Sequence, residues 1–520
     1  MSPPSQVPVL IAGGGPVGLA AAMELSLHGV ECAVIEPRPE VSWLRPRAKT
    51  VSARTMEHFR RWGLARRLRD RAPLAVAWSS NVVFCTTVTG REVTRFRDCF
   101  GLGLAGGDLV AEPGQQAPQP LVEQILREAV RDSAPARLIT GWRVTGAAQH
   151  GEVVRVTAED AGGRPATVEA GYVIGCDGAR SVVREAIGAR LAGSADGRLN
   201  VNVTFRAPAL AGQVPHGPAV QYWVLNPEQP GIVGRLDLDA TWWCIANGVT
   251  QAAAEADPSS IVRAMTGSDG PVEVLATDAW NARMQLADRY ARGRMFIAGD
   301  AAHQNPPYGG HGFNTGVGDA VNLGWKLAAV LHGWAPPALL GTYESERRPV
   351  ADVTVAEAAS NMATLATELA DPRLMGTSGE FGDVLPALRA AIHRTKDREF
   401  HSLDLVLGYS YHDSPITEKA PGSGERLPHR WMAAGDSLYD HLGPEFTLMR
   451  CGPGAARDDG GFAAAARDCG IPLATIGLNA PDWERRVGGP LVLVRPDQHV
   501  SWSGAPPADA RGLLRAAAGW

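Results

Sequence analysis

The feature that most constrains this chain is a glycine-rich turn near its N-terminus, set between an apolar run and a helical pattern. Gly13, Gly15 and Gly18 follow the run VPVLIAG and open PVGLAAAMELSLHG, and Glu36 ends the next apolar run, ECAVIE. Glycine permits a tight turn, lets a phosphate approach the backbone, and allows a helix to pack closely on a sheet. The helix N-terminus offers unpaired N–H groups to an anion. The pattern predicts a βαβ unit that binds a dinucleotide, with Glu36 on a ribose.

Two further acidic residues stand at the ends of apolar runs far from this turn. Asp177 follows YVIGC, and Asp300 follows MFIAG. Ligands of parallel-sheet folds bind at the carboxyl ends of the strands, so we expect both residues beside the first turn. Either one alone is equally consistent with ordinary turn chemistry. Together with the first turn, they indicate a ligand longer than one nucleotide.

Length and composition predict several domains and no charged macromolecular partner. A chain of 520 residues is too long for one hydrophobic core, and a net charge of -5 offers no basic surface to nucleic acid. The sequence shows no membrane-spanning run and no signal peptide. Its seven cysteines are scattered without a C-x-x-C pair, which disfavours disulfides and zinc. We expect a cytoplasmic protein with no metal and no membrane partner.

The predicted secondary-structure pattern changes several times along the chain, and these changes predict its domain organisation. The pattern is α/β over residues 1–180 and 285–350. Residues 181–284, with part of 75–115, alternate as antiparallel strands. Residues 351–425 are helical and then polar and turn-rich, so we expect part of the stretch from Gly376 to Gly424 to be a linker. Residues 426–520 form a small α/β pattern.

Three stretches together resemble the FAD motifs of one enzyme family. They are GGGPVG with Glu36, GCDGARSVVR, and RMFIAGDAAHQNPPYGGHGFNTGVGDAVNLGWKL. The family is the class A flavin-dependent aromatic hydroxylases, the para-hydroxybenzoate and phenol hydroxylase superfamily. RPRAKTVSARTMEHFRRWG also resembles its segment after the second strand, and the likeness covers most of Val7 to Pro349. The nearest likeness is to bacterial hydroxylases of aromatic polyketides and phenols.

The resemblance implies an α/β fold in three parts. A Rossmann-like FAD-binding domain would take residues 1–180 and 285–350, and an antiparallel-sheet substrate domain would be inserted into it. Residues 351–425 would form a helical and linker region. Residues 426–520 would form a thioredoxin-like domain, which has no C-x-x-C and is therefore assigned to structure or dimerisation.

The resemblance also assigns residues to FAD. Arg47 and Gln119 match cofactor-contacting positions, although Arg47 is also consistent with a surface charge and Gln119 with a plain helix start. Asp300 would bind a ribityl hydroxyl, and Asp177 would stand in a second layer near the pyrophosphate. The implied cofactor-binding set is Gly13, Gly15, Pro16, Val17, Gly18, Glu36, Pro37, Arg47, Gln119, Asp177, Asp300, Pro307, Gly309, Gly310, Gly312, Phe313 and Asn314.

The second glycine-rich stretch holds two histidines. His303 invites a catalytic pair with Asp300, but the resemblance implies that it supports the loop. His311 would contact the flavin or the substrate, or fill space. The helix that follows would direct its N–H groups and positive dipole end at the flavin N1–C2 edge, where reduction gathers negative charge.

The implied activity is hydroxylation of an electron-rich aromatic ring, phenolic or of polyketide type, by a single-component monooxygenase. NADPH or NADH would reduce FAD transiently, and O2 would form a flavin C4a-hydroperoxide in a dry site. The sequence holds no second nucleotide fingerprint, so we expect no separate NAD(P)H-binding domain. The flavin itself would do the chemistry, with Arg235 and His311 as the protein's candidate catalytic residues.

Substrate contacts are expected from the antiparallel region. Side chains alternate along a strand, so of Trp242 and Trp243 only one can line a cavity. Aromatic residues in a sheet are equally expected in core packing. The candidates for substrate contact are Tyr222, Trp223, Trp243 and Pro307.

Several alternatives stay open at this stage. A flavin halogenase is disfavoured because the W-x-W-x-I-P segment is absent. Baeyer–Villiger-type or ring-opening oxygenation of a polyketide would use the same scaffold, and a non-catalytic FAD-binding protein would keep the glycine motifs. A homodimer is also open.

Overall fold

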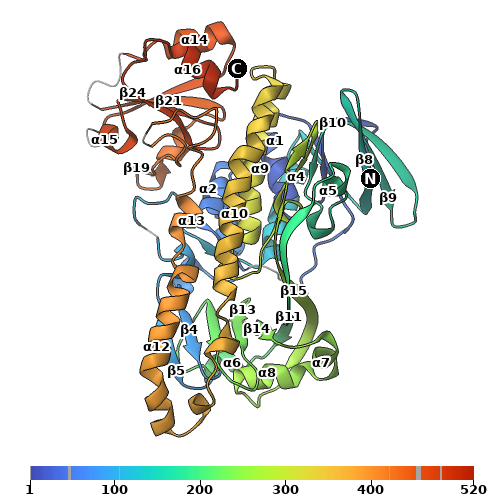
Figure 1. Ribbon diagram of the computed structural model, residues 1–520, viewed down its shortest axis with the longest axis vertical. Helices are drawn as coiled ribbons and strands as arrows, with labels where there is room; N and C mark the ends of the chain where they lie inside the picture. Colours follow the sequence, from blue (N-terminus) through green and yellow to red (C-terminus); the bar gives the residue numbers. More distant parts are fainter. Residues whose placement is uncertain (1, 45–48, 105, 421, 453–457, 481–482) are drawn as a thin grey trace.

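The computed structural model describes residues 2–44, 49–104, 106–420, 422–452, 458–480 and 483–520. Arg47 lies outside these described residues. Three larger sheets organise the chain, and the mostly green second sheet at the bottom of the view lies apart from the red C-terminal part at the top left (Figure 1). Among the described helices, none combines the length and the apolar character that crossing a bilayer requires.

The first sheet carries the glycine motifs at the ends of parallel strands. Its strands β17, β10, β1, β2 and β7 are parallel neighbours, and β8 and β9 extend it as an antiparallel hairpin next to β10. This arrangement confirms the Rossmann-like fold, because the carboxyl ends of β1, β10 and β17 lie side by side. The bounds are β16 (Ala291–Arg292), β17 (Met295–Ile297), β10 (Pro165–Gly175), β1 (Gln6–Ala12), β2 (Cys32–Glu36), β7 (Ala136–Thr140), β8 (Trp142–His150) and β9 (Val153–Asp160).

The second sheet is the expected antiparallel one. All its neighbouring strands are antiparallel except β12 and β4, and its edge strand β18 directly follows the turn at Asp300. The chain therefore passes from one sheet to the other within the second glycine-rich stretch. In sheet order the strands are β18 (His303–Gln304), β15 (Glu273–Ala287), β11 (Leu191–Arg206), β14 (Thr241–Asn247), β13 (Gly231–Arg235), β12 (Gln221–Val224), β4 (Val82–Cys85) and β5 (Glu92–Phe96).

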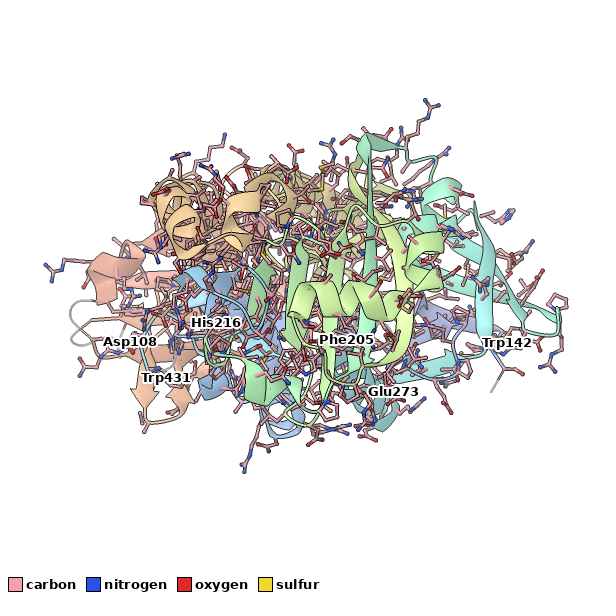
Figure 2. The ribbon with its side chains drawn as sticks, turned by 90° about the horizontal axis from the view of Figure 1, so that it is seen from below. Asp108, Trp142, Phe205, His216, Glu273 and Trp431 are labelled. Carbon is pink, nitrogen blue, oxygen red and sulfur yellow. The ribbon has the colours of Figure 1, made fainter. Side chains whose placement is uncertain are left out.

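This second sheet has two buried faces with different neighbours. The outer face forms an apolar cluster with α8, which contains Phe205, Trp242 and Ile261. The inner face packs against α12 and the second glycine stretch in a cluster that contains Trp223 and Tyr308. Figure 2 shows Phe205 near the middle of the molecule, viewed from below.

Helices fill the remaining layers. Helix α10 stands upright through the middle of the molecule, and α12 lies beside β4 and β5 (Figure 1). The larger helices are α1 (Pro16–Leu27), α2 (Ala53–Arg61), α3 (Ala65–Arg71), α4 (Gln119–Asp132), α5 (Val182–Ala186), α7 (Gln251–Ala256), α8 (Pro258–Thr266), α9 (Gly312–Leu331), α10 (Thr342–Met362), α12 (Ser378–Phe400) and α13 (Leu403–Leu407).

Helix α12 occupies the first half of the stretch from Gly376 to Gly424, part of which was expected to be a linker. The helix has 23 residues. Thr377 and Glu380 form a capping box at its start. One stripe that includes Val384 and Leu388 is buried against the inner face of the second sheet. Tertiary packing therefore stabilises a segment whose glycines and internal proline weaken its helical pattern.

The C-terminal part has the thioredoxin-like topology. The chain order is strand, helix, strand, helix, strand, strand, helix, with β21 parallel to β22 and antiparallel to β23. In sheet order the strands are β22 (Leu473–Leu478), β21 (Phe446–Cys451), β23 (Leu491–Val494) and β24 (Val500–Gly504), and the helices are α14 (Phe462–Cys469), α15 (Trp483–Val487) and α16 (Ala510–Ala517).

This C-terminal part shares a hydrophobic core with helix α9, which packs against the region of the first sheet. Trp325 of α9 stacks on Trp334, and Phe446 of β21 packs edge-on against both rings. At another point, the Trp431 indole N–H donates to the carbonyl of Gly107 at 3.1 Å. Asp108 and Trp431 accordingly lie close together in Figure 2. The C-terminal part is therefore packed on the rest of the molecule by apolar and polar contacts.

Candidate functional site

The first two glycine motifs are in contact at the ends of neighbouring strands. Gly13 has φ +98°, and a Cβ there would lie 2.3 Å from the carbonyl oxygen of Cys176 and 3.0 Å from the Cα of Asp177. A Cβ on Gly18 would lie 2.0 Å from the carbonyl oxygen of Gly13. Glycine is required at both positions because backbone already fills the space of a side chain.

The second glycine-rich stretch meets the first at Val17. A Cβ on Gly299 would lie 2.9 Å from Val17 Cγ2, and one on Gly316 would lie 2.5 Å from the same atom. The Gly316 position is also 3.0 Å from the Cα of Gly299. Helix α9 therefore packs closely on α1. The turns after β1 and β17 lie together although most strands of the second sheet come between them in the sequence.

Glu36 closes one side of the first turn. Its Oε2 accepts from the backbone N–H of Gly14 at 2.8 Å, and its Oε1 accepts from Arg38 Nε at 2.6 Å. Arg127 Nη2 lies 3.6 Å from the same carboxylate. This geometry places a carboxylate at the carboxyl end of β2, and Pro37 follows it at the rim.

The two strand-end aspartates have different surroundings. Asp177 Oδ2 accepts from the backbone N–H groups of Val182 at 2.7 Å and Val183 at 3.3 Å, which caps α5. Burial raises the pKa of Asp177 despite these donors. Asp300 stands in the 3₁₀ turn η4 (Gly299–Ala301), with its side chain exposed.

His303 pairs with Asp319 of α9. His303 Nε2 lies 2.8 Å from Asp319 Oδ2, which also accepts from the backbone N–H of Gly299 at 3.1 Å. Arg347 Nε donates to the other carboxylate oxygen at 2.8 Å. Burial alone would raise the pKa of Asp319, but Arg347 and His303 hold it below its ordinary value. The histidine therefore fixes the loop, as the resemblance implied.

The turn before α9 is tied to the segment after β2. Gly309 and Gly310 have φ of +88° and +71°. Asn314 Nδ2 donates to the carbonyls of Gly310 at 2.7 Å and Thr50 at 3.2 Å, and its Oδ1 accepts from the backbone N–H of Ser52 at 3.0 Å. A pocket opens beside this turn, lined by Thr50, Ser52, Phe100, Gly101, Gly309, Gly310, His311, Asn314, Ser402, Leu403 and Val406.

His311 is a buried and neutral member of this pocket. Burial lowers its pKa to about 4, so the imidazole carries no charge at neutral pH. Within the described chain its Nε2 has no hydrogen-bond partner, and a Cβ on Gly309 would lie 2.5 Å from that nitrogen. Pro307 is exposed at the start of the turn, and Gly312 and Phe313 are half-buried in the first turn of α9.

The donor set fits FAD. Helix α1 begins at Pro16 after Gly15, has no side-chain cap and no acidic residue in its first turn, and nothing lies within 4 Å of the Cβ position of Gly15. Helix α9 likewise begins without a side-chain cap. Two helix N-termini are thus free to face anionic or electron-rich ligand groups. Gln119 is half-buried at the first position of α4.

Strand alternation divides the expected substrate residues between two faces. Trp223 and Trp243 belong to the inner face, whereas Tyr222 and Arg235 belong to the outer one. The Tyr222 hydroxyl donates to the carbonyl of Gly217 at 2.7 Å, and the Arg235 guanidinium lies 5.2 Å from the ring centre of Trp242. Tyr222 and Arg235 therefore point away from the inner face, and their expected roles at the site stay predictions.

The two inner-face tryptophans also differ. Trp223 is fully buried, stacks on Phe84 and lies under the Lys396 ammonium, so it serves as core. Trp243 is half-buried on the same face. Sequence reasoning missed Trp280, which is half-buried there too and donates to Asn202 Oδ1 at 2.9 Å. The period-2 pattern of its strand could have found it.

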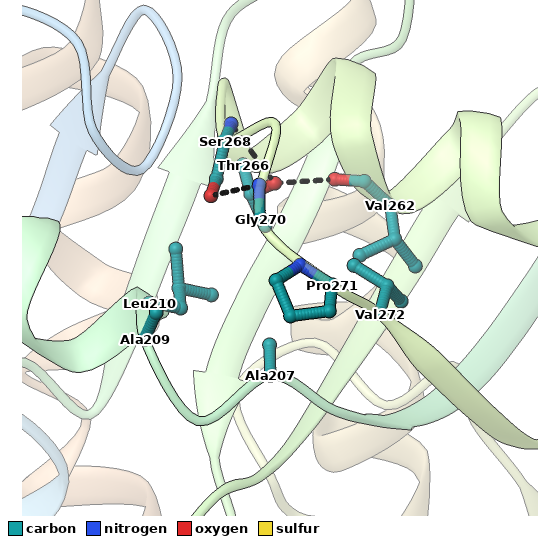
Figure 3. A pocket seen from close by; sticks show the side chains of 9 residues that line it. All are labelled: Ala207, Ala209, Leu210, Val262, Thr266, Ser268, Gly270, Pro271 and Val272. Carbon is teal, nitrogen blue, oxygen red and sulfur yellow. Dashed lines mark hydrogen bonds between the residues drawn. The ribbon is translucent and has the colours of Figure 1, made fainter.

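A second pocket lies on the outer face of the second sheet. Figure 3 shows its apolar lining from the end of β11, the start of β15 and α8, with the Thr266 hydroxyl donating to the carbonyl of Val262. Leu210 and Val262 belong to the outer cluster, so the sheet separates this pocket from the glycine turns. No charged side chain lines it.

Comparison with known proteins agrees with this geometry. Residues 6–358 match the FAD binding domain family, and residues 420–520 match the aromatic-ring hydroxylase C-terminal family. The chain is 33% identical to tetracenomycin A2 monooxygenase-dioxygenase of Streptomyces glaucescens, over 98% of this chain and 96% of the relative. It is 30% identical to 2,4-dichlorophenol 6-monooxygenase of Cupriavidus pinatubonensis, over 97% and 94%.

A solved structure extends the likeness to the whole fold. The rebeccamycin biosynthetic enzyme RebC with reduced flavin superposes with a TM-score of 0.90 at 33% identity, covering all of both chains. The matched FAD domain alone exceeds half of the chain. On this evidence the chain belongs to the FAD-dependent aromatic-ring hydroxylases.

Proposed function

We propose that this FAD-dependent monooxygenase hydroxylates an electron-rich aromatic ring of the phenol or polyketide class, with NADPH or NADH as transient reductant and O2 as oxidant. The observation that carries the proposal is the packing of the second glycine-rich stretch against Val17 of the first. The half-buried tryptophans of the inner sheet face support it, because they offer an aromatic surface for a substrate.

The chain's residues divide the work of binding between the two turns. Gly15 and the α1 N-terminus would hold the pyrophosphate, with Pro16, Val17 and Gly18 supporting the turn. Glu36 would accept from the ribose. Asp300 would accept from a ribityl hydroxyl, as its exposed place in η4 allows.

The turn before α9 would bind the ring end of the cofactor. The positive end of the α9 dipole favours negative charge at the pyrimidine edge. His311 contributes a neutral imidazole to this edge, because its pKa of about 4 keeps it uncharged at working pH. The chemistry that bound FAD supplies is reduction by NAD(P)H followed by activation of O2.

The substrate class is inferred from the inner face and from the relatives. Trp243 and Trp280 offer flat apolar surfaces, and Asn202 adds a polar group beside them. The names of the relatives specify tetracenomycin A2, 2,4-dichlorophenol and rebeccamycin biosynthesis, all of which involve aromatic rings. We therefore assign a mono- or polycyclic phenol to this chain.

Isotopically labelled oxygen tests the proposal. The holoprotein is incubated with NADPH or NADH and a panel of phenols and polycyclic phenols, and products are read by mass spectrometry. The expected product carries one labelled oxygen on an intact ring, with no dependence on halide. An oxygen insertion that expands or opens a ring would show Baeyer–Villiger-type chemistry instead. Flavin reduction without any labelled product would contradict the proposal.

A further inference from the structure

Lysine is rare in this chain, and most of it is buried. Four of the 50 basic residues are lysines. Lys419 is exposed, whereas Lys49 is 8% exposed and Lys326 and Lys396 are fully buried. Lysine is among the residues least often buried without a partner, so each buried one needs an explanation.

Two of the buried lysines have carboxylate partners and the third does not. Lys326 pairs with Glu346 at 2.6 Å, and Lys396 pairs with Glu399 at 2.7 Å. The Lys49 Nζ donates to the backbone carbonyl of Val220 at 2.7 Å. In the part of the chain that the structure describes, no carboxylate is paired with it.

This environment makes Lys49 a weak acid near neutral pH. Burial, with a further contribution from the nearby Arg235 charge, lowers the pKa of Lys49 to about 7. Arg235 contributes through its charge from the outer face of the sheet, where it lies over Trp242. A buried ammonium without a counter-charge is unfavourable, so burial favours the neutral amine with its free lone pair. Such perturbed groups are enriched in functional sites.

Lys49 lies between the cofactor turn and the substrate sheet. Its neighbour Thr50 accepts a hydrogen bond from Asn314 at the start of α9. Its side chain reaches in the other direction, to Val220 just before β12. The Val220 carbonyl lies over Gly234 of the inner face, since a Cβ there would be 3.0 Å from that oxygen and 2.8 Å from Trp243 Nε1.

Two neighbouring polar atoms are left unsatisfied in the same region. Among the described residues, the buried Nε1 of Trp243 and the buried Oε1 of Gln116 have no hydrogen-bond partner. Gln116 pairs with Thr50 in the short ladder next to Lys49, and its Nε2 donates to the carbonyl of Ser79. Buried polar atoms without partners are rare in native proteins. The Lys49 amine and the Trp243 indole N–H thus lie near each other, around the Val220 carbonyl and Gly234.

We infer that Lys49 is a catalytic residue that takes the proton from an ionisable hydroxyl of the aromatic substrate, a phenol or an enol, and then pairs with the oxyanion. The substrate O–H bond breaks, its electron pair stays on oxygen, and the proton bonds to the lone pair of Lys49 Nζ. Trp243 Nε1 donates to the same oxyanion. A phenolate ring is richer in electrons than a phenol, which favours transfer of oxygen to it. The inference rests on the proposed function.

The test uses 4-nitrophenol, whose phenolate has its own visible band. The FAD-loaded wild type, Lys49→Met, Lys49→Arg and Trp243→Phe are titrated with this probe at several pH values, with Lys419→Met as the surface control. FAD content and bleaching by NADPH are measured for every variant. These two readouts report folding and the proposed function independently of Lys49.

The wild type and the Lys419→Met control should bind the probe as phenolate at a pH below its solution pKa. Lys49→Met should bind phenolate about ten-fold or more weakly, the loss expected for one charge-assisted contact. Lys49→Arg should bind phenolate but lose the rise of kcat/KM through pH 7, because guanidinium cannot accept a proton. Trp243→Phe should show a smaller loss of affinity.

Two results would overturn the inference. One is a wild type that holds FAD, is bleached by NADPH, and takes up no phenolate. The other is a Lys49→Met variant with normal FAD that binds phenolate as tightly as the wild type. A wild type that holds no FAD would instead refute the proposed function.

Discussion

The carboxylate of Asp319 accepts a hydrogen bond from the backbone N–H of Gly299 at 3.1 Å, and so joins helix α9 to the turn after β17. The same carboxylate binds Arg347 of α10 at 2.8 Å. Arg347 continues to the Tyr411 hydroxyl at 3.1 Å. One buried acid therefore fixes the second glycine stretch against the scaffold, and the position of the α9 N-terminus depends on it.

Asp319→Asn should weaken both the fold and FAD binding. The amide removes the charge that balances the buried Arg347, and breaking such a pair costs about 3–5 kcal/mol of unfolding free energy. Denaturant unfolding and a flavin-fluorescence titration measure the two effects. Asp371→Asn, which breaks the exposed pair with Arg373, is the matched control and should change neither. Equal behaviour of the two variants would contradict this role for Asp319.

Gly15→Ala and Gly18→Ala should fail in different ways. The Cβ position of Gly15 is open, so the alanine variant should fold with nearly unchanged apoprotein stability but lose FAD affinity, because its methyl group occupies the phosphate approach. The Cβ of Gly18→Ala would lie 2.0 Å from the carbonyl of Gly13, so this variant should lose stability as well. Thermal unfolding of the apoproteins separates the two. Full FAD affinity in Gly15→Ala would place the pyrophosphate elsewhere.

His311 should make the protein sensitive to mild acid. Its pKa is about 4 in the folded state and near 6.5 when unfolded, so the unfolded chain binds more protons between these values. Stability from this group is complete above pH 6.5 and falls as the pH drops towards 4, by about 3 kcal/mol in total. His311→Gln should lack this component when unfolding curves are compared across the window. Parallel pH dependences of the two proteins would show that His311 is not buried as a neutral group.

Arg495→Met should uncouple the C-terminal part. Arg495 of the turn after β23 binds both oxygens of Glu346 in α10, at 2.7 and 2.8 Å. Its loss leaves Glu346 with the Lys326 ammonium and the neutral donors Asn322 and Ser414, at an expected cost of about 3–5 kcal/mol. Calorimetry should then resolve two unfolding transitions in place of one. A single transition with unchanged midpoint would show that the apolar contact around Trp325 suffices for docking.

The nucleotide turn was predictable because local rules decide it. Gly13 to Gly18 and Glu36 lie within one βαβ unit, so spacing along the chain decides their arrangement. Helix α12 was not predictable in this way, since its stripe is stabilised by a sheet strand from far away in the chain. The faces of Tyr222 and Arg235 were not predictable for a related reason, because the sequence shows alternation but not which side of the sheet each set of side chains occupies.

The burial of Lys49 was not predictable from the sequence for a different physical reason. A lysine among the arginines of RPRAKTVSART is most simply interpreted as a surface charge. Its burial arises only when β3 (Thr50–Val51) is placed between Asn314 and Val220, which are far apart in the sequence. The scarcity of lysine was the one signal that could have drawn attention to it.

The most direct test of the account is the visible spectrum of the purified protein during anaerobic titration with NADPH or NADH. We predict one FAD per chain, bleaching by the nicotinamide that is faster with a bound phenol, and return of the yellow colour on admission of air. Gly15→Ala should remain colourless under the same conditions. A folded wild-type protein that neither retains nor takes up FAD would contradict the claim that its two glycine-rich turns form one flavin site.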